Sequence, residues 1–136
     1  MKDCMEATEN AFRYYGLGKA QMPPKSYLYF NDYKGDLRCM PAYIPDLGAS
    51  GIKAVNVHPE NRKANLPTVM ATILLIDPKT GFPIAVMDGT HITNMRTGAA
   101  GGIAIKYLAK DKCKKIAFIG AGIQAQTQLE AALLAK

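Results

Sequence analysis

Hydrophobic and polar positions follow three successive patterns along the 136 residues. In residues 3–17, Met5, Phe12 and Tyr15 recur at helical spacing and glycines follow, so we expect an amphipathic helix. From Lys25 to Asp88 the period falls to two, which is typical of half-buried strands. The extended segments we expect, joined by turns rich in Pro, Gly, Asn and Asp, are residues 25–30, 37–44, 52–57, 69–76 and 82–87.

The connections between these segments favour a mainly antiparallel sheet. Residues 77–81 contain the Pro and Gly of a tight hairpin, and residues 58–67 form a polar loop. After Asp88 the pattern changes again, to a long helix over residues 91–109, a short apolar strand over 116–119 and a helix from Gly122 onward. We therefore expect an α/β fold in which a mainly antiparallel sheet precedes a β-α unit.

The composition is that of an ordinary globular chain. Hydrophobic residues make up 49% and charged residues 21%, which excludes disorder, and no apolar run approaches the roughly 18 residues of a membrane helix. The acidic start does not resemble a signal peptide, so we expect a cytoplasmic protein. Cys4, Cys39 and Cys113 are widely spaced and only two histidines are present, which argues against disulfides and against a metal site.

The positive charge is concentrated in one segment. The chain has 17 Lys and Arg against 11 Asp and Glu, and residues 106–115 hold five lysines with one acid and one aromatic residue, Tyr107. A nucleic-acid surface needs a broader basic face with aromatic platforms. We interpret the run as solvated lysines between a helix and a strand, and expect no nucleic-acid partner.

A glycine-rich turn gives the sharpest chemical signal. Residues 116–119 lead into Gly120, Gly122 and Ala125, the pattern G-x-G-x-x-A at the start of a helix. The first glycine permits a tight turn, the second lets a pyrophosphate approach, and the helix N-terminus holds the phosphates. The acidic ribose ligand expected about 20 residues further on lies beyond Lys136, so the dinucleotide-binding domain is expected to be incomplete.

Lys53 and a glycine-rich helix are the other notable features. Alternation places Lys53 on one strand face with Val55, where burial would lower a lysine pKa and suit proton transfer; a lysine that reaches back to water is the competing interpretation. Gly98, Gly101 and Gly102 cost a helix on the order of 1 kcal/mol each, so a backbone or a ligand should come close to them.

Arg96 and Thr97 stand at the head of this glycine-rich stretch, in the early turns of the helix, where anions are favoured. Arg96 is therefore either a bidentate clamp for a carboxylate or phosphate, or a surface arginine.

Taken together, these motifs resemble the ornithine cyclodeaminase and mu-crystallin family. The segments that carry the resemblance are Met40-Pro41-Ala42-Tyr43, Gly51-Ile52-Lys53, Leu66-Pro67-Thr68-Val69, residues 81–89, Arg96-Thr97-Gly98-Ala99-Ala100 and residues 120–125. Residues 18–25 and 35–42 look most like the archaeal-type alanine dehydrogenases within that family. The resemblance covers nearly the whole chain.

The resemblance implies a homodimer with an antiparallel substrate-binding and dimerisation domain over residues 1–88. A connecting glycine-rich helix over 89–112 and the start of a Rossmann domain for NAD or NADP over 113–136 complete the expected organisation. The family's chains are much longer, so the sequence is expected to be truncated at both ends.

The family's functional residues carry over by position. Lys53 matches the catalytic lysine, which also contacts substrate, while Arg38 and Arg96 match ligands of the substrate carboxylate; Lys25 could share the role of Arg38. The positions that correspond to cofactor contacts are Thr68, Arg96, Thr97, Gly120, Gly122, Ile123, Gln124 and Ala125.

The implied activity is that of an NAD(P)-dependent amino-acid oxidoreductase of the alanine dehydrogenase kind, which converts an L-amino acid to a 2-oxo acid and ammonia. Three alternatives remain: an ornithine cyclodeaminase that forms proline, a non-catalytic dinucleotide-binding protein of the mu-crystallin kind, and an inactive truncated product.

Overall fold

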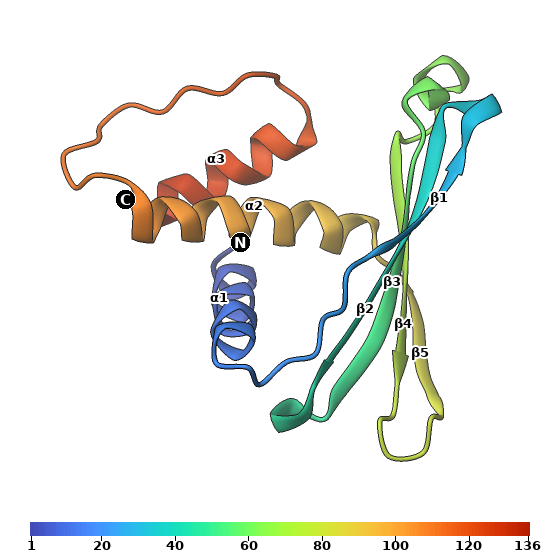
Figure 1. The fold of residues 1–136 in the computed structure, drawn as a ribbon. Helices are drawn as coiled ribbons and strands as arrows, with labels where there is room; N and C mark the ends of the chain where they lie inside the picture. Colours follow the sequence, from blue (N-terminus) through green and yellow to red (C-terminus); the bar gives the residue numbers. More distant parts are fainter. The chain divides into compact units, whose positions relative to one another are not determined.

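The computed structural model describes residues 1–136, which form two compact units. The sheet unit consists of Tyr14–Thr90, and the helical unit consists of Met1–Arg13 together with His91–Lys136. Figure 1 shows the strands of the first unit and the helices of the second. No helix is long and apolar enough to cross a membrane.

The sheet unit is an antiparallel meander. Its five strands lie in the order in which they follow along the chain, and each pairs with the next in antiparallel register, so the predicted antiparallel sheet is confirmed. Lys34, Gly48 and Gly81 turn the hairpins with φ of 49°, 57° and 74°. The strands are β1 (Ser26–Phe30), β2 (Gly35–Ile44), β3 (Ala49–Val57), β4 (Val69–Ile76) and β5 (Pro83–Asp88).

The register assigns side chains to two faces, because directly paired residues of neighbouring strands point the same way. Lys53 pairs with Met40 on β2 and with Ile73 on β4. Val55, buried on the same face, pairs with Arg38 and Ala71. We call this side the lysine face; its main members are Tyr27, Asp36, Arg38, Met40, Lys53, Val55, Ala71, Ile73 and Met87.

The other side of the sheet, which we call the apolar face, is formed by large aliphatic residues. Leu28 is 60% exposed, Met70 37% and Val86 71%. In β4, Met70 and Leu74 share this side, and Leu74 pairs with Val86. The apolar face thus leaves a band of hydrophobic side chains in contact with solvent.

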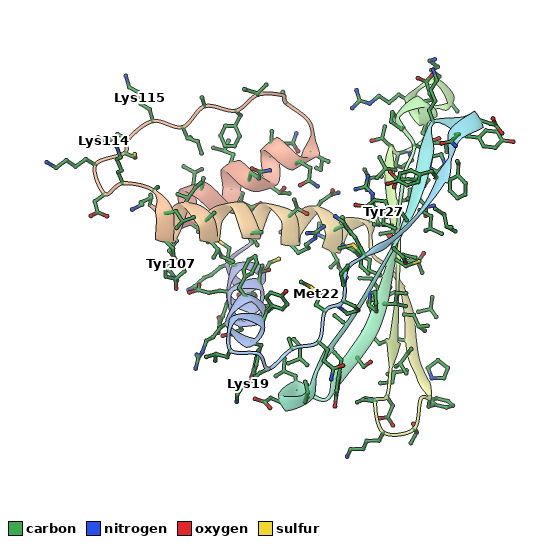
Figure 2. All side chains as sticks on the ribbon, in the orientation of Figure 1. Lys19, Met22, Tyr27, Tyr107, Lys114 and Lys115 are labelled. Carbon is green, nitrogen blue, oxygen red and sulfur yellow. The ribbon has the colours of Figure 1, made fainter.

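The helical unit contains α1 (Lys2–Gly16), α2 (Thr90–Leu108) and α3 (Ile123–Ala135). Met5, Ala99 and Ala131, one from each helix, form its buried core. At the surface Lys106 Nζ donates a 2.8 Å hydrogen bond to Glu9 Oε2, and the hydroxyl of Tyr107, labelled in Figure 2, donates to Glu9 Oε1. The three helices thus meet at this core, and the ion-paired cluster adds a surface contact between α1 and α2.

The glycines of α2 are explained by α3. A Cβ added to Gly98 would lie 2.6 Å from the backbone carbonyl of Thr127, and one added to Gly102 would lie 2.7 Å from the Cβ of Ala131. The sequence left open whether a backbone or a ligand comes close to these glycines. In the structure the backbone of α3 lies against Gly98 and Gly102. The helix interface requires them because no side chain fits between the two backbones.

Two local predictions differ from the structure. Residues 116–119 form no strand; they belong to an exposed loop over 109–122, in which Lys114 and Lys115 point outward (Figure 2). A strand requires a neighbouring strand with which to form backbone hydrogen bonds, and none of these 136 residues forms a strand next to this segment. The predicted polar loop over 58–67 contains a six-residue 3₁₀ helix, Pro59–Ala64, closed by Asn65 with a φ of 57°.

Candidate functional site

Lys53 lies in the middle of β3, on the lysine face and only partly exposed. Its paired neighbours, Met40 and Ile73, are apolar, and Val55 two residues further along is 5% exposed. The alternation in the sequence placed Lys53 on the side of Val55, and the register adds Met40 and Ile73.

Arg38 on β2 is held by a carboxylate of its own strand. Its Nε and Nη2 each donate a hydrogen bond of 2.8 Å to Asp36, one to either carboxylate oxygen. Hydrogen bonding to Asp36 raises the pKa of the Arg38 guanidinium, which is charged in any case. The ring of Tyr27, paired directly opposite on β1, has its centroid 5.4 Å from Arg38 Cζ. Arg38 is thus fixed both by a carboxylate and by an aromatic ring.

Arg38 and Lys53 share the lysine face. Arg38 pairs with Val55, two residues from Lys53, so the two cations are diagonal neighbours, with Cα atoms roughly 7 to 8 Å apart in such a register. Lys25 Nζ lies 5.6 Å from the centroid of the Tyr27 ring, which adds a third cation. This face can bind a carboxylate and place a proton-transferring amine next to it.

The glycine turn forms the second group of candidate residues, in the helical unit. Gly120 has a φ of 99°, a conformation in which a side chain would be strained, and Gly122 caps α3 in an extended conformation. No heavy atom lies within 4 Å of a Cβ built on either glycine. The start of α3 therefore presents the amides of Ile123 and Gln124 to an open space that suits an anion, whereas the amide of Ala125 donates a 2.9 Å hydrogen bond to the Gly122 carbonyl.

Gln124 links this turn to the start of α2. Its Nε2 donates a 2.8 Å hydrogen bond to Asn94 Oδ1, while its Oε1 is buried and has no partner. Thr93 Oγ1, on α2, is likewise buried without a partner. Unpaired buried polar atoms are costly, so these atoms, together with the open turn, fit a polar ligand such as a dinucleotide.

The remaining candidates are Arg96, Thr97 and Thr68. Arg96, in the second turn of α2, is solvent-exposed, although partial desolvation lowers the pKa of its guanidinium; it stays charged at neutral pH. Thr97 Oγ1 donates a 2.7 Å hydrogen bond to the carbonyl of Thr93, one turn earlier. Thr68 directly precedes β4, and its carbonyl accepts a 2.8 Å hydrogen bond from the amide of His58.

The structure thus assembles two groups of predicted residues, each within one unit. Lys53 and Arg38 meet on the lysine face, while Arg96 and Thr97 lie on α2, which Gln124 joins to the glycine turn through Asn94. Sequence reasoning missed Asp36, Tyr27 and Asn94. An acid two residues before an arginine within a strand, which puts both on one face, is the signal that would have identified Asp36.

Comparisons with known proteins identify the relatives of this chain. Residues 1–135 match the model of the ornithine cyclodeaminase/mu-crystallin family. The chain is 59% identical over 131 residues to an alanine dehydrogenase of Archaeoglobus fulgidus, an alignment that covers 96% of this chain and 39% of that protein.

Two solved structures are similar to nearly the entire chain. An archaeal alanine dehydrogenase dimer with bound NAD superposes with a TM-score of 0.93 at 56% identity, over 99% of this chain and 41% of that one. A Thermococcus litoralis Δ1-pyrroline-2-carboxylate reductase in complex with NADH and L-proline superposes with a TM-score of 0.96 at 47% identity, over 99% and 42%. The chain thus spans about two fifths of the length of these relatives.

Proposed function

Because the chain belongs to the ornithine cyclodeaminase/mu-crystallin family, we propose that it supplies part of an NAD(P)-dependent amino-acid oxidoreductase of the alanine dehydrogenase kind. The reaction is the conversion of a small L-amino acid to a 2-oxo acid and ammonia, or its reverse. The observation that carries the proposal is the presence of Arg38 and Lys53 on one sheet face with apolar neighbours. Residues 1–88 then act as the substrate and dimerisation domain, 89–112 as a connecting helix, and 113–136 as the start of a Rossmann domain.

Each residue of the proposed site has a defined task. Arg38 and Arg96 bind the substrate carboxylate, since guanidinium groups hold carboxylates through paired hydrogen bonds. Nicotinamide, when bound, exchanges a hydride with the substrate Cα. Lys53 takes up a proton as water adds to the resulting imine and returns one as ammonia leaves.

The residues of the helical unit fit NAD or NADP. The φ of Gly120, the open space at Gly122 and the amides of Ile123 and Gln124 suit a pyrophosphate. The unpartnered Oε1 of Gln124 offers an acceptor for a cofactor hydroxyl. Thr68, Arg96, Thr97 and Ala125 complete the proposed contacts through their correspondence with the family's positions.

A second candidate function is reduction of a cyclic imine. The TM-score of 0.96 with the Thermococcus litoralis reductase favours it. Both reactions exchange a hydride at the carbon that carries the amino acid's nitrogen, so the same site serves either. The substrate separates the two candidate functions. An alanine dehydrogenase interconverts L-alanine with pyruvate and ammonia, whereas an imine reductase interconverts L-proline with its cyclic imine. L-ornithine tests for cyclodeaminase activity.

The proposed working form is a cytoplasmic homodimer. One relative of known structure is an alanine dehydrogenase dimer. The apolar face of this chain exposes Leu28, Met70 and Val86, a band that a second copy would cover.

The test uses what we call the joined enzyme, in which this chain replaces the matching segment of the Archaeoglobus fulgidus alanine dehydrogenase. We expect NAD(P)-dependent turnover of one of the three substrates, followed by the absorbance of the reduced cofactor. Lys53→Ala should abolish turnover and leave dinucleotide binding intact, whereas Lys79→Ala, in an exposed hairpin turn, should change neither. Absence of turnover, or full turnover by Lys53→Ala, would refute the proposal.

A further inference from the structure

Asp36 and Arg38 form a more ordered pair than a common surface salt bridge. Both carboxylate oxygens are engaged, at 2.8 Å from Nε and 2.8 Å from Nη2, and the side chains are 16% and 32% exposed. The two residues are two positions apart on β2, so their side chains leave the same face of the sheet. Paired, partly buried hydrogen bonds of this kind define the plane of the guanidinium.

Aromatic rings define its position from a second direction. Tyr27 lies opposite Arg38 in the register, and its ring centroid is 5.4 Å from Arg38 Cζ. Tyr29, opposite Asp36, stacks on Tyr27 with centroids 5.6 Å apart and ring planes 8° apart. Figure 2 labels Tyr27 on the sheet, at the level where β1 and β2 pair. The guanidinium is therefore restrained by a carboxylate along one edge and by a ring against one face.

This restraint leaves one binding edge of Arg38 available. A guanidinium has five N–H groups in a rigid fork, and Asp36 takes two of them, on Nε and Nη2. The two N–H groups of Nη1 and the second of Nη2 remain, and they form another edge able to bind a carboxylate through paired hydrogen bonds.

We propose that Asp36 is a positioning residue, and Tyr27 its aromatic support, which together hold Arg38 so that its Nη1–Nη2 edge binds the substrate carboxylate. This inference rests on the proposed function, because it assumes that Arg38 binds substrate. Neither residue touches the reacting atoms; both act through Arg38.

The charge of Asp36 has an effect on substrate binding that opposes its positioning effect. The negative charge of Asp36 also repels an incoming carboxylate, so its removal would strengthen substrate binding if charge were its only influence. Positioning predicts weaker binding instead, because a released arginine must be ordered again each time substrate binds. The charge effect is screened as the Debye length falls from about 8 Å at physiological salt to about 3 Å at 1 M, whereas the positioning effect persists.

The experiment compares variants of the joined enzyme. In Asp36→Asn we expect the KM for the amino acid to rise about tenfold at low and at high salt, with the KM for NAD(P) unchanged. Tyr27→Leu should raise the same KM about threefold and Tyr27→Phe should not, because cation–π attraction needs the ring and not the hydroxyl. Asp32→Asn, in an exposed turn of the same sheet, is the matched control.

A double-mutant cycle separates positioning from a general structural role. In an Arg38→Lys background, which lacks the fork, Asp36→Asn should have little further effect on KM. Titration of the same four proteins with pyruvate in a calorimeter measures carboxylate binding without turnover. Circular dichroism establishes that each variant is folded.

Two results would overturn the proposal. One is an unchanged or lowered KM for the amino acid in Asp36→Asn. The other is that Asp36→Asn raises this KM as much in the Arg38→Lys background as it does when Arg38 is present. Either would leave the proposed function standing, provided that turnover by the parent joined enzyme depends on Lys53. An inactive parent would count against the proposed function, and the pyruvate titrations would still decide the role of Asp36.

Discussion

The substitution Gly98→Ala tests whether the α2–α3 contact explains the glycines of α2. The new Cβ would lie 2.6 Å from three atoms of Thr127, its carbonyl carbon, carbonyl oxygen and Cβ. Two of these atoms belong to the α3 backbone and cannot move aside alone, so the helices must separate. Overpacking costs about 1 to 3 kcal/mol, against a gain of about 1 kcal/mol in helix propensity. We expect a net destabilisation of up to about 2 kcal/mol.

Gly101→Ala, one turn further along the same helix, is the matched control. Its Cβ would lie 3.3 Å from Gln128 Oε1, the end of a flexible side chain that can rotate away. Only the gain in helix propensity, up to about 1 kcal/mol, then remains, and this variant should be as stable as the parent or more stable. Gly102→Ala should behave like Gly98→Ala, because its Cβ would lie 2.7 Å from the Cβ and 3.0 Å from the carbonyl oxygen of Ala131.

Urea unfolding of the chain, followed by far-ultraviolet circular dichroism, measures the difference. With a slope of roughly 1 to 3 kcal/mol per M, the helical transitions of Gly98→Ala and Gly101→Ala should lie about 1 M urea apart. If Gly98→Ala unfolded at the same concentration as Gly101→Ala, the close helix contact would not be the reason for the glycine, and a ligand would again be the better explanation.

Three further predictions concern other parts of the molecule. Arg96→Lys in the joined enzyme should raise the KM for the amino acid at least about tenfold, because lysine cannot reproduce the guanidinium fork; unchanged kinetics would make Arg96 a surface residue only. The chain by itself should bind NAD weakly, because it holds only the glycine turn and the first helix of the dinucleotide-binding domain, and submicromolar binding in calorimetry would contradict this. Hydrogen bonds from Lys106 and then Tyr107 lower the pKa of Glu9 below its ordinary value of 4.5, so the stability contributed by Glu9 is present above that value and is lost as the pH falls through the lowered pKa. Glu9→Gln should therefore reduce the loss of thermal stability between about pH 5 and pH 3, and an unaltered acid dependence would argue against the contact.

The sheet could be predicted closely from the sequence because all its partners are consecutive in the chain. Each strand pairs with the next one, so alternation and turn residues were sufficient to locate the strands and to put Lys53 beside Val55. Residues 116–119 have the same apolar character but form no strand. Strand formation depends on a neighbour to pair with, which a local pattern cannot reveal.

The candidate site was predicted in part for a related reason. Alternation puts Lys53 on the side of Val55, but only the register shows that Arg38 shares this face and that Tyr27 lies opposite Arg38. The bond between Gln124 and Asn94 joins residues 30 positions apart, on two helices whose packing depends on Gly98. Pairings of this kind follow from tertiary geometry, and no spacing rule within one element predicts them.

The division of the helical unit along the chain has a consequence for biosynthesis. α1 is translated before the sheet unit, whereas Ala99 and Ala131, which pack against Met5 of α1, are translated after it. At about 5 to 20 residues per second, α1 waits for several seconds without the surface that buries it. The meander has only sequence-local pairings and can form during that interval, which shortens the loop that must close when α1 finally docks. Nascent chains stalled before α3 should therefore contain a folded sheet and an α1 that is still accessible to proteases and chaperones.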